Sequence, residues 1–211
     1  MDRTDRVTEI GGYYHIYNRG VDKRDIYLSE ADYQYFLLGL DYYRDSQAKQ
    51  PLSQTDTRRI DPLRLIKQPV VEVLCYYLLP NHYHLLVRED STHGVGTYLS
   101  KIQNSYTQYF NTHQHRSGHL FQGPFQIVQV ETDEQLLILS RYIHLQGFTA
   151  QLTNSIESPW SSVGGYLASE KTFCNTKLIS SLAKSQSYRD FLENYKEYAR
   201  TLATIKHLLH E

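Results

Sequence analysis

The chain has 211 residues, 40% of them hydrophobic and 21% charged, and its net charge is −1 with histidines counted as neutral. These values are ordinary for a soluble globular protein, and the length is ample for a hydrophobic core. They exclude a chain that spans a membrane, since no apolar run approaches the ~18 residues of a membrane helix. Only two cysteines occur, without a CxxC pair, and residues 1–12 lack the apolar core of a signal peptide, so we expect a cytoplasmic protein with no membrane partner.

Hydrophobic periodicity and turn signals predict the order strand, helix, strand, strand, helix, strand, followed by a third helix. In chain order these elements are a strand at 13–20, a helix at 28–47, strands at 70–80 and 82–89, a helix at 94–113, a strand at 124–130 and a helix at 132–147. Thr132 and Gln135 have the spacing of a capping box at the start of the last helix, and Gly147 is expected to end it. The polar stretch 46–69 contains three prolines and predicts a loop.

This order of elements indicates an α+β fold, in which a ferredoxin-like antiparallel sheet of the split β-α-β type carries helices packed on one face. We expect the main domain to occupy residues 1–167. Residues 168–187 are rich in Ser, Lys and Thr, so the remainder, 168–211, is expected to form a linker and a C-terminal helical extension.

The predicted strand 82–89 begins with His82, Tyr83 and His84 inside an otherwise apolar run. Side chains alternate faces along a strand, so the two histidines lie on one face, about 6.5–7 Å apart, and Tyr83 lies on the other. Neutral imidazole is a common metal ligand, and two rings at this spacing can converge on one ion. The alternative is a structural pair of half-buried histidines that bind backbone carbonyls or water, and the spacing alone does not decide between them.

The last predicted helix places Tyr142 and Gln146 one turn apart on the same face. If this face meets the two histidines, the amide of Gln146 can complete a metal site, with the phenol of Tyr142 near a phosphate bound to the metal. A Mg²⁺ or Mn²⁺ ion polarises a phosphodiester, and tyrosine can attack as a nucleophile to form a covalent intermediate. The alternative is that Tyr142 packs in the core among apolar neighbours such as Ile138 and Leu145.

Several motifs resemble those of the REP-associated tyrosine transposases, which belong to the single-tyrosine transposases of the HUH type, where HUH means His–hydrophobic–His. The motifs that carry the resemblance are "YYHIYNRGVDKRDIY", "PNHYHLLV", "YFNTHQHRSGHLFQGPF", "SRYIHLQ" and "PWSS". Together they span residues 12–167 in the expected order, which makes the set far more specific than the two histidines alone.

The resemblance implies an insertion-sequence-like, metal-dependent transposase of single-stranded DNA with the HUH endonuclease fold. By position, His82, His84 and Gln146 would hold Mg²⁺ or Mn²⁺. Tyr142 would attack a phosphodiester, leaving a 5′-phosphotyrosine and a free 3′-OH, and a 3′-OH could reverse the attack to rejoin strands without ATP. The implied partner is a single-stranded DNA hairpin, from a repetitive extragenic sequence or an element end, bound by a monomer or a homodimer.

Two positions depart from the family pattern. Members often carry Asn-Pro where this chain has Gln146 and Gly147, although the amide of glutamine remains a suitable oxygen ligand. A basic residue is common beside the aromatic Phe125, whereas this chain has Pro124 and Gln126. The second departure removes positive charge from a strand that we expect to face DNA.

Five further residues are candidates for DNA contacts, because they are basic or lie in the polar loop after the second predicted helix. They are Arg19, Arg24, Lys101, Arg116 and His119. Each has a plainer interpretation as a solvated surface side chain. Tyr106 and Tyr109 recur at core spacing in the second predicted helix, so we expect them to pack in the core.

We therefore expect a transposase and single-stranded DNA endonuclease with Tyr142 as the nucleophile. One alternative is a hairpin-binding protein that keeps the fold but does not cleave. Another is a metal phosphodiesterase in which water is the nucleophile. The complete set of two histidines, one tyrosine and one glutamine favours the transposase, because a protein that only binds DNA has no need of all four.

Overall fold

The structure, a computed structural model, describes residues 8–61, 64–168, 170–183 and 187–209. Its strands are β1 (Tyr13–Arg19), β2 (Val71–Leu79), β3 (His82–Glu89) and β4 (Gln126–Val130). Its α-helices are α1 (Glu30–Tyr42), α2 (Gly94–His113), α3 (Asp133–His144), α4 (Gln146–Thr149), α5 (Val163–Tyr166), α6 (Lys177–Leu182) and α7 (Tyr188–Leu209). Short 3₁₀ helices lie at Val21–Lys23, Leu52–Gln54 and Thr57–Arg59.

The four strands form one antiparallel sheet in the order β2-β3-β1-β4. The central pair, β1 and β3, aligns Tyr17 with His84 and Arg19 with His82. Because both members of an aligned pair project to the same face of the sheet, this register brings these four side chains together on one face. The strand order and the sequence of helices and strands are ferredoxin-like, so the predicted fold class is confirmed.

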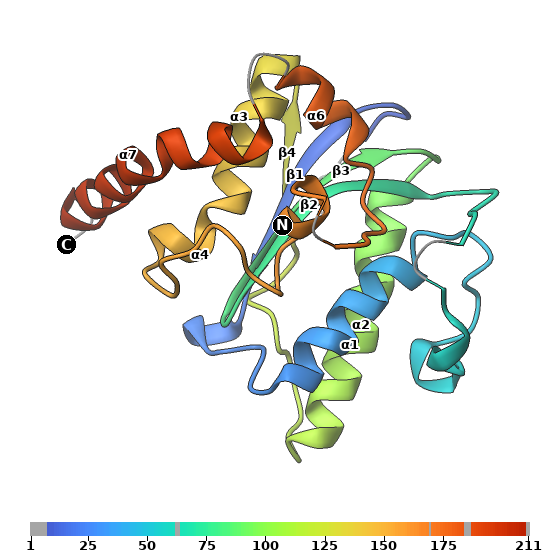
Figure 1. The fold of residues 1–211 in the computed structure, drawn as a ribbon. Coiled ribbons are helices and arrows are strands. Elements are labelled where there is room, and N and C mark those ends of the chain that lie inside the picture. Colours follow the sequence, from blue (N-terminus) through green and yellow to red (C-terminus); the bar gives the residue numbers. More distant parts are fainter. Residues whose placement is uncertain (1–7, 62–63, 169, 184–186, 210–211) are drawn as a thin grey trace.

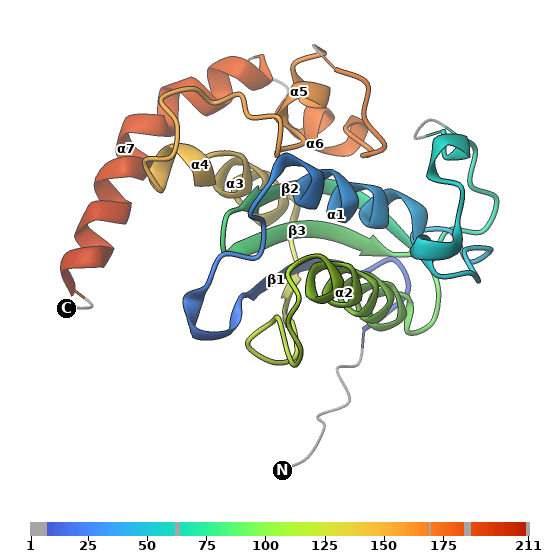
Figure 2. The ribbon, with the colours of Figure 1, turned by 90° about the horizontal axis from the view of Figure 1, so that it is seen from below.

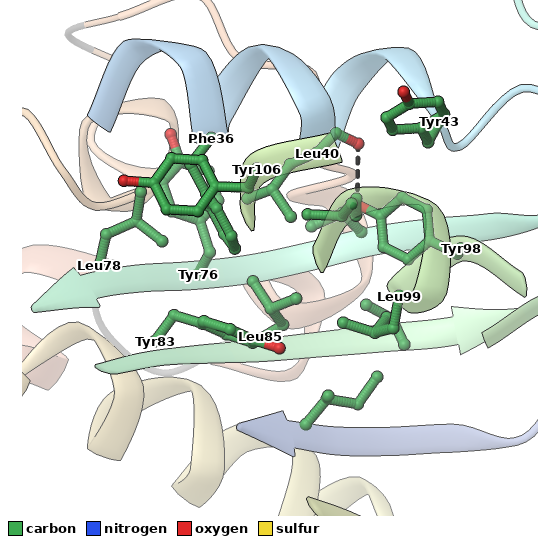
Figure 3. Close-up of a cluster of buried hydrophobic side chains, with 14 of the residues drawn as sticks. Phe36, Leu40, Tyr43, Tyr76, Leu78, Tyr83, Leu85, Tyr98, Leu99 and Tyr106 are labelled. Atoms are coloured by element: carbon green, nitrogen blue, oxygen red, sulfur yellow. Dashed lines mark hydrogen bonds between the residues drawn. The ribbon is translucent and has the colours of Figure 1, made fainter. Parts of the chain in front are cut away.

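The helices α1 and α2 pack against each other on one face of the sheet, as expected (Figure 1). Figure 3 shows Tyr83 and Leu85 of β3 in the buried cluster with Phe36 and Leu40 of α1. The hydroxyl of Tyr98 on α2 donates a hydrogen bond of 2.7 Å to the Leu40 carbonyl, which joins the two helices. Several further tyrosines are buried in the same cluster: Tyr14, Tyr27, Tyr43, Tyr76 and Tyr106.

The opposite face of the sheet is covered by α3, which packs against β2 and β3 and lies across the sheet from α1 and α2 in Figure 1. A second buried cluster joins Leu86 of β3 to Leu136 and Ile143 of α3. The helices of the split β-α-β pattern thus cover one face, and a helix that follows the pattern covers the other.

Helix boundaries follow local capping chemistry. The side chain of Ser29 accepts a hydrogen bond from the Asp32 backbone and the Asp32 carboxylate accepts one from the Ser29 backbone, so α1 begins with a reciprocal capping box. The helix ends at Tyr42, five residues short of the predicted end at 47. Just beyond Tyr42, the Arg44 carbonyl accepts a hydrogen bond of 2.9 Å from the Val70 N–H, which joins the two ends of the 46–69 loop next to the start of β2.

The C-terminal segment packs back onto the domain. Figure 2 shows α7 beside α3 and α4, and α6 also contacts α3. Ile179 of α6 and Phe191 and Leu192 of α7 are buried in the cluster that lies beneath α3. Across the described residues, no helix is both long enough and apolar enough to span a membrane.

The division of β3 between two faces gives a first prediction. Tyr83 is fully buried, and its hydroxyl accepts a hydrogen bond of 2.6 Å from the Gln103 side chain. Replacing Tyr83 with alanine removes a large ring from the α1–α2 core, so we expect the free energy of unfolding to fall by about 3–5 kcal/mol in denaturant titrations. The control is Tyr142→Ala, on a tyrosine that is 47% exposed, for which we expect a loss under about 1 kcal/mol. Equal losses for the two variants would contradict the assigned faces.

Candidate active site

A pocket of about 520 Å³ opens on the α3 side of the sheet, where β1 ends and β3 begins. Its walls come from β1, β3, the segment leading into β4, α3 and the first residue of α4. The lining residues are Tyr17, Asn18, Arg19, His82, His84, Gln122, Pro124, Gln126, Tyr142 and Gln146. This lining carries one cation, Arg19, and no carboxylate, so it suits an anionic ligand.

His82 and His84 both line the pocket, with ring centroids 5.2 Å apart, while Tyr83 lies in the core on the other face. The Nδ1 atom of each ring is already engaged. The Nδ1 of His82 is 2.6 Å from the Asn81 side-chain oxygen, and the Nδ1 of His84 is 2.9 Å from the Nε2 of His15. In both rings the Nε2 atom is therefore the one left for a ligand.

The histidines are held in their neutral form. Burial, with a smaller contribution from the nearby Arg19, lowers the pKa of His82 to about 4. Burial also lowers the pKa of His84 well below its usual value, with smaller contributions from the neighbouring histidines and Arg19. Burial lowers the pKa of His15 to about 4. Neutral imidazole is the form that binds a metal ion, so the environment favours ligation at pH 7.

Tyr142 lies over the histidines from α3. Its ring is edge-on to His84 and to His15, with centroids 5.7 Å and 6.3 Å away, and the residue is 47% exposed. The sequence alternative, in which Tyr142 packs in the core, is therefore wrong. The exposed phenol can be reached by a large substrate while the ring remains anchored on the pocket floor.

Gln146 also lines the pocket and is 8% exposed. Its side-chain N–H donates a hydrogen bond of 3.3 Å to the Tyr142 carbonyl, which leaves the amide oxygen for another partner. The predicted single helix over 132–147 does not hold, since α3 ends at His144 and Gln146 is the first residue of α4. Tyr142 and Gln146 still face one pocket, because the break between the two helices is a single residue, Leu145.

Gly147 does not act as the helix terminator that the sequence predicts. It lies within α4, and it is not among the described glycines with positive φ. A Cβ at this position would overlap the hydroxyl of Tyr77 on β2. The glycine is therefore needed for close approach of α4 to the sheet, and that approach holds Gln146 beside the histidines.

The donor set fits a divalent cation that accepts both nitrogen and oxygen ligands. Among the described residues, no group of three or more His, Cys, Asp and Glu side chains could hold a metal ion. A site here therefore needs the amide oxygen of Gln146 as the third ligand beside His82 and His84. Two imidazole nitrogens and one amide oxygen suit Mn²⁺ better than Mg²⁺, which prefers oxygen alone.

A buried hydrogen-bond network joins α3 to α7 and to Ser162. The ring of His144 lies 2.7 Å from the Tyr188 hydroxyl and 2.8 Å from the Ser162 hydroxyl. The Tyr188 hydroxyl also donates to the Ser140 hydroxyl at 3.1 Å. Arg141 adds a cation–π contact, with its guanidinium 3.7 Å from the ring centroid of Tyr195. The C-terminal helix α7 thus holds the helix that carries Tyr142.

The predicted DNA-contact residues are spread over the molecule. Arg19 lines the pocket. Arg24 lies in the segment after β1, with its guanidinium 3.7 Å from Asp22. Lys101 donates a hydrogen bond of 3.1 Å to the Ala48 carbonyl from α2, on the face of the sheet away from the pocket. Of these three residues, the structure therefore brings only Arg19 to the pocket that contains His82 and His84.

Arg116 and His119 lie in the loop after α2. The Arg116 guanidinium donates to the side chain of Asn111 at 2.6 Å and to the His119 carbonyl at 2.9 Å, so it shapes the loop from within. His119 lines a second pocket, formed by α2 and residues 119–124, and this pocket shares Pro124 with the pocket that contains the two histidines.

Three residues that line the pocket were not singled out from the sequence, namely Tyr17, Asn18 and Gln122. His15, which contacts the pocket residue His84 from β1, was missed as well. His15 and Tyr17 share a face of β1 with Arg19, and period-two alternation in the first strand was the signal that could have found them. Tyr106 is buried and Tyr109 packs against the α1–α2 core, as predicted.

Comparisons with known proteins bear on the family and the fold of the chain. Residues 42–146, about half of the chain, match the model of the family described as "Transposase IS200 like", which confirms the resemblance inferred from the motifs. A solved structure of a REP-associated tyrosine transposase bound to a REP hairpin is similar in fold, with a TM-score of 0.59 at 14% identity over 80% of this chain and 86% of that one.

A crystal structure of a putative transposase from Deinococcus radiodurans R1 matches at 16% identity over 69% of this chain and 98% of that chain, with a TM-score of 0.30. No curated protein matches the chain.

The position of Gly147 gives a second prediction. Gly147→Ala forces α4 away from Tyr77, so we expect the free energy of unfolding to fall by about 1–3 kcal/mol. We also expect weaker Mn²⁺ binding in calorimetric titrations, because Gln146 moves with α4. The control is Gly96→Ala on α2, where an added Cβ meets nothing within 4 Å. That variant should keep or gain stability, by up to about 1 kcal/mol. Unchanged stability and Mn²⁺ affinity in Gly147→Ala would argue against the close approach.

The buried His144 gives a third prediction, on pH dependence. Burial lowers its pKa to about 3, against about 6.5 for an exposed ring. Below about pH 6.5 the unfolded chain therefore binds a proton at His144, whereas the native protein keeps this ring neutral. The free energy of unfolding falls as the pH drops from 6.5 toward 3, by up to about 1.4 kcal/mol per pH unit. Denaturant titrations between pH 7 and 4 should show a steeper loss for the native protein than for His144→Gln. Parallel curves would contradict this assignment.

Proposed function

Because the chain belongs to the IS200-like transposase family, whose members are DNA transposases, we propose that it cleaves and rejoins single-stranded DNA at hairpin ends through a covalent bond to Tyr142. One observation carries the proposal. An exposed phenol lies over two histidines whose Nε2 atoms are left for a ligand, in a pocket that holds one cation and no carboxylate.

The proposed reaction is a transesterification. The Tyr142 oxygen attacks phosphorus and loses its proton, while the bond from phosphorus to the 3′ oxygen breaks and that oxygen takes up a proton. The products are a 5′-phosphotyrosine and a free 3′-OH. Attack of a 3′-OH on the phosphotyrosine breaks the bond to Tyr142 and restores a phosphodiester. Each step exchanges one phosphate ester for another, so no external energy source is needed.

His82, His84 and Gln146 are the residues that would hold a divalent cation, either Mn²⁺ or Mg²⁺. When bound, such an ion supplies positive charge that polarises the scissile phosphate and stabilises charge in the transition state. Arg19, on the strand next to His82, adds a permanent positive charge at the same wall of the pocket. The neutral rings described above support this assignment.

A DNA hairpin is the proposed partner. The structurally similar REP-associated transposase is bound to a REP hairpin, and this chain shares that fold. The half-exposed Tyr142 supports a polymeric substrate, because a nucleophile for a small ligand is usually enclosed. Pro124 and Gln126 line the pocket, so the loss of basic residues there lowers the charge offered to the backbone.

The test uses Mn²⁺ and labelled hairpin DNA with single-stranded flanks, and the readout is a covalent adduct on a denaturing gel. We expect an adduct with the native protein and none with Tyr142→Phe, because phenylalanine has no nucleophilic oxygen. His84→Ala should lose most of the adduct, as should removal of Mn²⁺ by a chelator, while hairpin binding in gel-shift assays persists in all three cases.

The matched control is Tyr17→Phe, which alters another tyrosine in the same pocket. We expect this variant to retain the adduct. If Tyr17→Phe lost it and Tyr142→Phe kept it, the nucleophile would be Tyr17. Cleavage without any adduct would indicate hydrolysis by water, and binding without cleavage would indicate a hairpin-binding protein.

A further inference from the structure

A third histidine, His15, contacts the pocket residue His84 and has no part in the reaction proposed above. His15 projects from β1 toward the α3 side of the sheet, and its ring stacks on His84 with centroids 5.2 Å apart. The Nε2 of His15 is 2.9 Å from the Nδ1 of His84. We propose that His15 is a positioning residue that accepts the Nδ1–H of His84, and so fixes the tautomer in which the Nε2 of His84 is free to bind a cation. This inference rests on the proposed role of His84 as a ligand.

The hydrogen bond between His15 and His84 joins two neutral rings. A neutral imidazole carries one N–H donor and one lone pair, so a hydrogen bond between two such rings has two possible directions. If His84 donates from Nδ1, its Nε2 carries a lone pair and can bind a metal. If His15 donates instead, the Nε2 of His84 carries the proton and cannot bind. The direction of this one hydrogen bond therefore decides whether His84 can serve as a ligand.

The other histidine of the pair has no such ambiguity. The amide N–H of Asn81 donates to the Lys23 carbonyl at 3.1 Å, which turns the Asn81 oxygen toward His82. An amide oxygen can only accept, so the Nδ1 of His82 must carry the proton and its Nε2 is free. His84 is buried more deeply than His82, and its partner is a ring that can both donate and accept. Of the two proposed histidine ligands, only His84 can therefore change its tautomer, and His15 is the residue that sets it.

The strand register explains why position 15 can reach His84. Tyr17 is aligned with His84 across the β1–β3 ladder, and His15 is aligned with Leu86, two residues farther along the same face. Diagonal neighbours on one face of a sheet lie within reach of aromatic side chains. The edge of Tyr142 closes over both rings, with centroids 6.3 Å from His15 and 5.7 Å from His84. His84 itself is only 7% exposed, which limits the access of water that could replace His15 as the acceptor.

Two substitutions separate the acceptor from the bulk of the ring. His15→Phe keeps an aromatic ring against His84 but removes the nitrogen that accepts. His15→Gln places an amide oxygen near the position of the Nε2 atom and restores an acceptor without a ring. Val128→Ala is the matched control, because Val128 is the β4 residue aligned with His15 on the same face and is 51% exposed.

The main measurement is Mn²⁺ affinity of the full chain without DNA, from calorimetry or from the free Mn²⁺ resonance signal. We expect His15→Phe to weaken affinity about tenfold or more, as is usual when the partner of a ligating histidine is lost. His15→Gln should stay within about threefold of the native protein, and Val128→Ala should be unchanged. An affinity in His15→Phe equal to that of the native protein, or an equal loss in His15→Phe and His15→Gln, would overturn the proposal.

A second measurement uses the native protein and requires neither a substitution nor a bound metal. Nitrogen-15 NMR of the histidine rings in the native protein reports directly which nitrogen carries the proton. We expect His84 with the proton on Nδ1 and His15 with a bare Nε2, and the opposite pattern would overturn the proposal. These outcomes do not depend on Tyr142. A protein that binds Mn²⁺ with the predicted tautomers but forms no adduct refutes the proposed reaction while leaving the role of His15 intact.

Discussion

The site depends on the antiparallel pairing of β3 with β1 in a single register. Alternation along β3 sends Tyr83 into the α1–α2 core and leaves His82 and His84 on the other face. The register then sets Arg19 beside His82 and Tyr17 beside His84. A slip of one residue would move both histidines into the core and Tyr83 into the pocket. The large buried area of Tyr83 therefore stabilises the register on which the position of the histidines depends.

Tyr142, the proposed nucleophile, is held at this face by a different kind of support. Two residues of α3 on either side of Tyr142 are held by α7, because Ser140 and His144 both form hydrogen bonds with the Tyr188 hydroxyl. Tyr142 itself stays half-exposed over the pocket. A helix whose inner side is held by hydrogen bonds inside a buried cluster can present an exposed side chain without losing its position. The C-terminal segment is thus part of the support of the site and not a detached extension.

Local patterns were enough to find the histidine pair and the order of strands and helices along the chain, because each depends on periodicity within single elements. Tyr142 and Gln146 belong to two helices, and they face one pocket because the break between those helices is a single residue. Longer-range features were not accessible. The contact of His15 with His84 joins residues 69 positions apart, and that of His144 with Tyr188 joins residues 44 apart. Gly147 was misassigned for the same reason: its role is set by Tyr77 on a distant strand, and no turn at its own position reveals it.

The neutrality of the proposed ligands makes the affinity for a cation depend on the residues that orient them. All three proposed ligands are neutral, and no carboxylate lines the pocket, so a bound divalent ion would keep nearly its full charge for the phosphate. The same neutrality gives weaker binding of the ion than an acidic site would give. Affinity must then come from ligand atoms that already point the right way before binding. In this fold that orientation comes from outside the ligand set: from Asn81, from His15, and from the glycine that lets α4 approach the sheet.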